Sequence, residues 1–290
     1  MKVTRRDGRS MGSPLRLTLP GSDEAEADAA WVVTRSTFTE AESTLTRFDA
    51  ASPLSRLNQR AGAWIPIPPL LGLALSAAWH AYRATNGRFD PRIIGALEAA
   101  GEHAGVALPP SPRHLGEGDA WLRLDARRDR ARVSAPIDLG GIGKGLALRW
   151  AGGALRRMGH TRFLIAAGGD IVAAGLGPAE RPWVVGIEDP GNAERTLTTL
   201  ELVDAAVATS SISVRSWHDA GGHLRHHLID PATLAPATPV WASVTVLHPD
   251  PAWAEVHSKV GFLAGHRIAW RFRGPRAWWV EPSGRLHSAA

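Results

Sequence analysis

The sequence predicts an α+β fold, and two observations support this prediction. Short apolar segments of strand character outnumber the helical segments, and they dominate the chain after residue 120. Most of these segments are joined by short turns rather than by helices, which favours antiparallel sheets over a doubly wound parallel sheet. The composition, 44% hydrophobic and 21% charged, is that of an ordinary soluble globular protein that buries a sizeable core.

One strand and two helices are expected in the first part of the chain. A strand is predicted around residues 16–19, followed by a long helix over 27–48 and a polar loop over 52–58. A second apolar helix, over 70–85, should stop at Asn86-Gly87, a usual helix-end signal. The polar, proline-rich segment 109–119 is the best internal boundary.

Short strands are expected in the second part, and two helices interrupt them. One helix is predicted over 144–158, ending before Gly159. The other should begin with Asp250 as its cap and Pro251 in its first turn, and run to residue 264. The predicted strands cover residues 162–166, 170–174, 183–187, 196–203 and 243–247.

Composition excludes several classes of protein. Without any cysteine, the chain forms no disulfide and no thiolate metal site. No apolar run approaches the roughly 18 residues of a membrane span, and the N-terminus lacks the apolar core of a signal peptide, so we expect a cytoplasmic protein. The net charge of +5 is dispersed along the chain, which argues against nucleic-acid binding.

Lysine is rare in this chain. Arginine supplies 30 of the 33 basic residues, and only Lys2, Lys144 and Lys259 are lysines. Arginine presents a planar fork, whereas lysine is a compact point charge that suits a single phosphate oxygen. The two internal lysines both fall in motifs described below, although chance is an alternative explanation.

A glycine-rich segment, residues 138–145 (DLGGIGKG), leads directly into a predicted helix. Its four glycines let the backbone approach a ligand closely, and their N–H groups can face an anion. The helix start and Lys144 add positive charge, so the segment suits a phosphate group. It is not a Walker loop, because Gly145 stands where that motif has serine or threonine. A tight strand-to-helix turn is the alternative interpretation.

Two further segments carry polar groups that could do chemistry. Gly168-Gly169-Asp170 follows a predicted strand, and a simple hairpin is its default interpretation. In the segment 223–231, His226 and His227 are candidate general bases for a hydroxyl, because imidazole titrates near neutrality. Asp230 could orient His227. A structural histidine pair and a weak metal cluster are the alternatives, and the spacing matches no strong zinc pattern.

The last motif, AEVHSK over 254–259, lies in the predicted C-terminal helix. Glu255 and Lys259 are four residues apart and therefore share one face of the helix. Taken alone, they are best interpreted as a surface ion pair, which stabilises a helix by about 0.2–0.5 kcal/mol.

The order of these motifs resembles that of the ApbE flavin-transferase family. The resemblance extends from Met11 to about Gly265, and it rests on SPLSRLN with Asn58, NGRFDP, DLGGIGKG, AAGGDI, WVVGIEDP, ATSS, HHLIDP, and SVTVL followed by AEVHSK. It implies an α+β, T-fold-related domain of mainly antiparallel sheets flanked by helices. FAD would lie in the cleft between two lobes, expected at about 11–115 and 116–290, after ten flexible residues.

The resemblance also implies a reaction and a site. The expected enzyme is an FAD:protein FMN transferase, which attaches FMN to a threonine or serine hydroxyl of a client protein and releases AMP. His227 would take the hydroxyl proton, with Lys144 as a second catalytic residue. The expected contacts of FAD are Asp138, Gly140, Gly141, Lys144, Gly168, Gly169, Asp170, Ser210, His227 and Asp230.

The family's magnesium site is where this sequence departs most from the resemblance. A backbone carbonyl, here Gly143, and an aspartate and a threonine four residues apart hold the ion in the family. Glu255 and Lys259 stand at the last two positions, and a protonated lysine has no lone pair for a metal. The resemblance still implies Mg²⁺ as a cofactor, but we expect the Lys259 ammonium to occupy or border the place of the ion. Glu255 would then pair with Lys259 or reach a displaced metal. The other departures are Arg149 for aspartate, and Ser211 and Leu234 for glycines.

Two other functions remain open at this point. A FAD pyrophosphatase would use the same site with water as the nucleophile and would release AMP without a client. A non-catalytic flavin-binding or carrier protein would bind FAD and release no AMP.

Overall fold

The computed structural model describes residues 2–112, 114–115, 120–213, 215–218, 221–222, 224–265 and 276–289. The chain divides into two compact units. Unit 1 comprises Met1–Glu42, Lys144–Ser211 and Val240–Ala290, and unit 2 comprises Ser43–Gly143 and Ile212–Pro239. Residue 115 lies inside unit 2, so these units do not coincide with the expected lobes.

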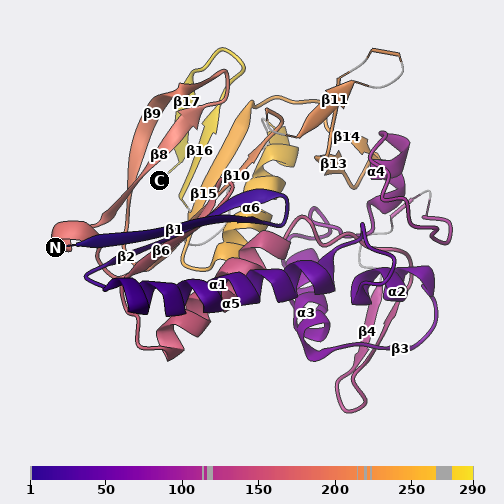
Figure 1. The fold of residues 1–290 in the computed structure, drawn as a ribbon. Coiled ribbons are helices and arrows are strands. Elements are labelled where there is room, and N and C mark those ends of the chain that lie inside the picture. The colour runs from indigo at the N-terminus through magenta and orange to yellow at the C-terminus, as the bar shows by residue number, and fades with distance from the viewer. Residues whose placement is uncertain are drawn as a thin grey trace. The chain divides into compact units, whose positions relative to one another are not determined.

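Unit 1 is built on one antiparallel sheet of eight strands (Figure 1). Its order is β1-β2-β6-β7-β10-β15-β16-β17, and every neighbouring pair in it is antiparallel. The strands are β1 (Val3–Ser10), β2 (Ser13–Pro20), β6 (Phe163–Ala167), β7 (Asp170–Ala174), β10 (Ala205–Ser211), β15 (Ser243–His248), β16 (Arg276–Val280) and β17 (Leu286–Ala289).

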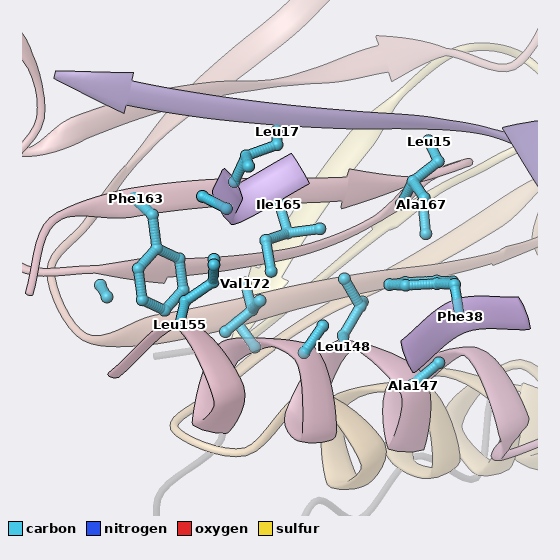
Figure 2. Close-up of a cluster of buried hydrophobic side chains, with 14 of the residues drawn as sticks. Leu15, Leu17, Phe38, Ala147, Leu148, Leu155, Phe163, Ile165, Ala167 and Val172 are labelled. Carbon is cyan, nitrogen blue, oxygen red and sulfur yellow. The ribbon is translucent and has the colours of Figure 1, made fainter. Parts of the chain in front are cut away.

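Side-chain alternation along these strands produces a core on each face of the sheet. On one face, the β6 residues Phe163 and Ile165 pack with residues of β2 and β7 against helices α1 (Glu24–Leu45), α5 (Gly143–Arg157) and α6 (Pro251–Ala264) (Figure 2). On the opposite face, Leu164 packs with the hairpin of β8 (Trp183–Asp189) and β9 (Asn192–Leu202). The predicted antiparallel character of the fold is confirmed.

The expectation of a flexible N-terminus through residue 10 is wrong. Residues 3–10 form β1, which pairs with β2 in register from Val3↔Pro20 to Ser10↔Ser13. The strand was missed because its sequence, VTRRDGRS, is polar. An edge strand needs little apolar surface when its backbone is paired along its whole length.

The described part of unit 2 contains helices, a small sheet and two ribbons. Its helices are α2 (Pro53–Gln59), α3 (Pro69–Ala84) and α4 (Ile94–Ala99). A three-stranded sheet has the order β3-β5-β4, with β3 (Ile65–Pro66), β4 (Leu122–Asp125) and β5 (Arg130–Val133). Two small ribbons pair β11 (Ser216–His218) with β12 (Leu224–His226) and β13 (Ile229–Asp230) with β14 (Ala235–Pro236).

Capping explains where the helices were and were not predicted. The Asp250 side chain accepts hydrogen bonds from the N–H groups of Ala252 and Trp253 at the start of α6, as the sequence predicts. The expected polar loop over 52–58 is instead mostly helix α2, whose cap is Ser52, with Pro53 in the first turn.

Of the expected boundary segment 109–119, residues 113 and 116–119 lie outside the described residues.

None of the helices in the described part of the chain is both long enough and apolar enough to span a membrane.

Candidate active site

In unit 1, the ammonium group of Lys144 lies between two buried carboxylates. Its Nζ contacts Oδ2 of Asp170, the first residue of β7, and lies 3.4 Å from Oε1 of Glu255 on α6. The two acid side chains are 3% and 4% exposed, and that of Lys144 is 28% exposed. Desolvation lowers the pKa of Lys144, but the two carboxylates outweigh it and raise this pKa above its ordinary value. Lys144 is therefore the charged partner of two acids.

Glu255 is a buried residue, and the interpretation of a surface ion pair is wrong for it. Its Oε2 accepts a hydrogen bond of 2.8 Å from the N–H of Gly145 in the first turn of α5. Desolvation raises the pKa of Glu255, and Asp170 adds to this, while Lys144, Lys259 and the Gly145 N–H oppose it without reversing it.

Gly145 allows α5 to approach α6 closely enough for this contact. A Cβ at this position would lie 2.5 Å from Cα and 2.8 Å from the backbone nitrogen of Ala252. Backbone atoms at such distances cannot be moved aside cheaply. The glycine that distinguishes the segment from a Walker loop is thus explained by helix packing.

The Gly168-Gly169 turn has the predicted hairpin form and places Asp170 beside Lys144. Ala167 pairs with Asp170 across the turn, and Gly168 has a φ of 63°, a value that favours glycine. Asp170 is 2% exposed, and its Oδ1 accepts a hydrogen bond of 3.3 Å from the N–H of Thr209.

Ser210, the next residue along β10, is also buried. Its hydroxyl lies 2.9 Å from the hydroxyl of Ser258 on α6, and Ser258 in turn donates to the Glu255 carbonyl. Two of the substituted family positions also make side-chain contacts in unit 1: Ser211 donates to the Ala242 carbonyl, and Arg149 pairs with the cap residue Asp250 at 2.6 Å.

Two of the three residues at the expected metal positions, Glu255 and Lys259, do not fit a magnesium ion. Magnesium requires oxygen ligands with available lone pairs in near-octahedral geometry. One oxygen of Glu255 accepts the Gly145 N–H and the other faces Lys144, while the ammonium of Lys259 has no lone pair to offer. Across the described ranges, no group of three histidine, aspartate or glutamate side chains is placed to hold a metal.

In unit 2, a side-chain amide holds the backbone just before the glycine-rich segment. Asn58, on α2, donates from Nδ2 to the Ile137 carbonyl at 2.8 Å and accepts at Oδ1 from the Ile137 N–H at 3.0 Å. Asn58 is completely buried. The two hydrogen bonds fix both backbone groups of Ile137 and thereby position Asp138.

The glycine-rich segment itself forms a tight turn into α5. The N–H of Gly140 donates to Oδ2 of Asp138 at 3.1 Å, and the N–H of Gly143 donates to the Leu139 carbonyl at 2.8 Å. Within the described residues, the N–H of Gly141 has no hydrogen-bond partner. Unlike its neighbours, Gly141 thus presents a donor that an anion can use.

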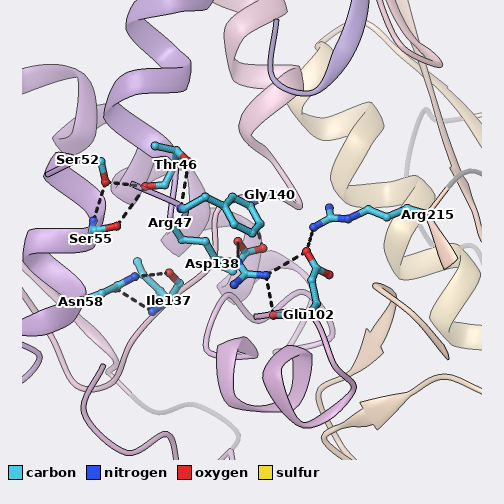
Figure 3. A network of polar contacts seen from close by, with 11 residues as sticks. Thr46, Arg47, Ser52, Ser55, Asn58, Glu102, Ile137, Asp138, Gly140 and Arg215 are labelled. Atoms are coloured by element: carbon cyan, nitrogen blue, oxygen red, sulfur yellow. Dashed lines mark hydrogen bonds and ion pairs between the residues drawn. The ribbon is translucent and has the colours of Figure 1, made fainter. Parts of the chain in front are cut away.

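A buried network that the sequence analysis missed continues from Asp138 (Figure 3). The side chain of Arg47 is 2% exposed. Its Nε lies 3.3 Å from Oδ1 of Asp138, and its Nη2 lies 3.0 Å from Oε1 of Glu102. Glu102 also contacts Arg215, so that one carboxylate bridges two arginines. Desolvation and the charge of Arg47 lower the pKa of Arg215. Neither arginine belongs to a local motif, and only the fold brings them together.

The two adjacent histidines are held in different ways. His227 directs Nδ1 to the carbonyl oxygen of Arg215, 3.1 Å away. A carbonyl only accepts hydrogen bonds, so Nδ1 carries the proton and the basic lone pair of the neutral ring is on Nε2. His226 is 3% exposed. Its Nε2 donates to the Ala237 carbonyl, and its Nδ1 accepts the Leu228 N–H.

His226 is therefore the structural member of the pair. Desolvation lowers its pKa, against the opposing effect of the Ala237 carbonyl. Asp230 does not take the expected part in orienting His227, since its carboxylate accepts from the Ala232 N–H in the following turn. His223, the first histidine of the motif, lies outside the described residues.

The turn after Asp230 also explains one departure from the family pattern. Leu234 has a φ of 53°, in the left-handed region where glycine has no steric penalty. The glycine that is usual at this position in the resemblance would adopt this conformation freely. Leu234 compensates in part because its side chain packs against a cluster that includes Ala96 and Ile229.

Comparisons with known proteins agree on one family. The model of the ApbE family matches residues 11–274. An FAD:protein FMN transferase of Haemophilus influenzae is 26% identical, over 91% of this chain and 81% of its own length. An enzyme of the same name from Klebsiella pneumoniae is 24% identical, over 84% of this chain and 73% of its own length.

Solved structures agree with this result. The crystal structure of an ApbE protein from Thermotoga maritima superposes with a TM-score of 0.85 at 26% identity, and the match covers 99% of this chain and 97% of that one. The flavin transferase ApbE of Vibrio cholerae has the same fold, with a TM-score of 0.80 at 20% identity, over 100% of this chain and 97% of that one.

Proposed function

The chain belongs to the ApbE family, and from this premise we propose that it is an FAD:protein FMN transferase. It moves the FMN part of FAD to a threonine or serine hydroxyl of a client protein. The names of its relatives support this function, and the described residues supply a base for the hydroxyl and a donor for a phosphate.

The observation that carries the proposal is the hydrogen bond from His227 Nδ1 to the Arg215 carbonyl. It leaves Nε2 as the basic nitrogen of a partly exposed ring. A hydroxyl is a weak nucleophile until a base takes its proton, and such a base typically contributes a factor of about 10² to 10⁴ in rate. Buried His226 has both ring nitrogens bonded to the backbone and is unsuited to this role.

The reaction is a substitution at the FMN-side phosphorus of FAD. The client oxygen forms a bond to this phosphorus, its proton passes to Nε2 of His227, and the bond to the bridging oxygen breaks as AMP leaves. The pyrophosphate repels an incoming nucleophile, and fixed N–H donors relieve this repulsion. The Gly141 N–H and the adjacent start of α5 are suited to bind a phosphate oxygen.

Magnesium has no part in the proposal, because the positions of Glu255 and Lys259 do not offer it ligands. Two of the other expected FAD contacts already have partners within unit 1. The Ser210 hydroxyl bonds to that of Ser258, and Asp170 pairs with Lys144. The place of FAD between two lobes and the cytoplasmic location stay predictions.

Product analysis tests the proposal. Purified protein is incubated with FAD, with and without a client protein that carries an acceptor threonine, and AMP and flavinylated client are measured. The proposal predicts AMP in equal amount to modified client and little AMP without client. AMP and free FMN without client would identify a pyrophosphatase. FAD binding without AMP under either condition would identify a carrier.

A further inference from the structure

We propose that the Lys144 ammonium is a built-in cation that takes the place of a metal ion between Asp170 and Glu255. The cluster of these three residues belongs to unit 1 alone, and the inference does not depend on the transferase activity. The native chain then binds no divalent cation at these acids, and removal of the ammonium creates a site that binds one.

The hydrogen bonds of the two carboxylates are the first argument. Each of their four oxygens already faces a donor. Lys144 Nζ contacts one oxygen of each acid, the Thr209 N–H serves the other oxygen of Asp170, and the Gly145 N–H serves the other oxygen of Glu255. A metal ion would have to displace the ammonium to gain a ligand from both acids.

The charge of the cluster is the second argument. Two carboxylates that are at most 4% exposed repel each other and stay ionised together only beside compensating positive charge. Lys144 provides one such charge. Lys259, one turn after Glu255 on α6, provides a second positive charge. This charge opposes the rise of the Glu255 pKa.

The residue type is the third argument. An ammonium is compact and resembles a metal ion as a point charge, whereas a guanidinium is a planar fork that needs more room. This chain uses arginine for 30 of its 33 basic residues, yet two of its three lysines act on this one pair of acids. The choice of lysine here fits a site that accepts only a small cation.

The consequence concerns what happens when the ammonium is removed. One oxygen of each acid lies close to the position of Nζ. Oδ2 of Asp170 contacts Nζ, and Oε1 of Glu255 is 3.4 Å from it. An uncharged side chain at residue 144 leaves two carboxylates facing that point, which is a donor set suited to Mg²⁺ or Mn²⁺. The variant should therefore acquire a divalent site.

The test uses the whole chain and Mn²⁺ as the probe. Wild type, Lys144→Met, Lys144→Met/Glu255→Gln and the control Lys2→Met are titrated with Mn²⁺ by electron paramagnetic resonance. Lys2 is the matched control, because it pairs with Glu24 at the surface. We expect Lys144→Met to bind one more Mn²⁺ than wild type and the control do. The double variant should lose this ion.

Thermal unfolding gives a second readout. Lys144→Met should unfold at a lower temperature than wild type in EDTA. Mn²⁺ at a hundred times its dissociation constant should then raise its midpoint by roughly 5 °C, as expected for a ligand of the folded state alone. The wild-type midpoint should not change between EDTA and Mn²⁺.

Two results would overturn the inference. One is a wild-type Mn²⁺ site that disappears in Glu255→Gln, a comparison that stands even if Lys144→Met does not fold. The other is a folded Lys144→Met that binds no additional Mn²⁺. Neither result bears on FMN transfer, which is measured separately.

Discussion

Nδ1 of His227 lies 3.1 Å from the carbonyl oxygen of Arg215, and this contact leaves the basic lone pair of the neutral ring on Nε2. Arg215 in turn contacts Glu102, which also pairs with Arg47, and Arg47 lies 3.3 Å from Asp138 in the glycine-rich segment. Within unit 2, the segment that carries His227 and the segment that carries Gly141, whose N–H has no partner among the described residues, are thus joined by one chain of ion pairs.

Asn58→Leu should lower the stability of the protein by about 2–4 kcal/mol. Leucine is similar in size but leaves the N–H and C=O of Ile137 buried without their partners, and each unsatisfied group costs about 1–3 kcal/mol. Chemical denaturation measures the loss. The exposed neighbour Gln59 provides the control, since Gln59→Leu should stay within about 0.5 kcal/mol of wild type. Equal stabilities for the two variants would contradict the role given to Asn58.

Gly145→Ala and Gly153→Ala should have opposite effects, although both lie on α5. The new methyl group at 145 would meet backbone atoms of α6 at 2.5–2.8 Å, and such overpacking costs typically about 1–3 kcal/mol. At Gly153 the nearest atom is the mobile guanidinium end of Arg157, at 3.5 Å, so alanine should stabilise the helix by about 0.5–1 kcal/mol. Thermal unfolding of both variants measures the difference, and a stabilising Gly145→Ala would show that the helices do not approach as described.

Stability should fall as the pH falls from about 6.5 towards 4, in part because of His257. Desolvation and the nearby charge of His248 lower the pKa of His257 to about 4. The unfolded chain therefore binds this proton first, and the contribution that is complete above pH 6.5 is lost as the pH approaches 4. The difference between a pKa of about 4 in the folded chain and 6.5 in the unfolded chain corresponds to about 3 kcal/mol of stability.

His257→Gln tests this pH dependence. The free energy of unfolding of the variant should depend less steeply on pH between 6.5 and 4 than that of wild type. His80 is exposed on α3, and His80→Gln should leave the slope unchanged. If all three proteins have the same slope, His257 is not a neutral buried histidine.

The sequence predicted the elements whose signals are local. The cap and proline that start α6, and the glycine pair of the β6–β7 hairpin, act within a few residues and were read correctly. Ser52 and Pro53 carry an equally local signal for α2, which was overlooked in a polar segment.

The site depended on contacts that no local pattern contains. Asp170 and Glu255 lie 26 and 111 positions after Lys144, so no local pattern groups the three residues. The sequence predicted Lys144 near a phosphate, and it predicted Glu255 in a surface ion pair or at the family's metal position. The bridge from Glu102 to Arg47 and Arg215 likewise spans unrelated segments. Only the folded chain distinguishes the His226 and His227 environments.

The most direct test of the account is the rate of FMN transfer by His227→Ala. Modified client is followed by mass spectrometry at saturating FAD, and FAD binding is measured by flavin fluorescence. Because a base acts on the client hydroxyl and not on FAD, transfer should fall by about 10² to 10⁴ while FAD binding stays close to wild type. His226→Gln, the matched control, should lower stability but retain transfer in its folded fraction. Transfer by His227→Ala within a few-fold of wild type would contradict the account.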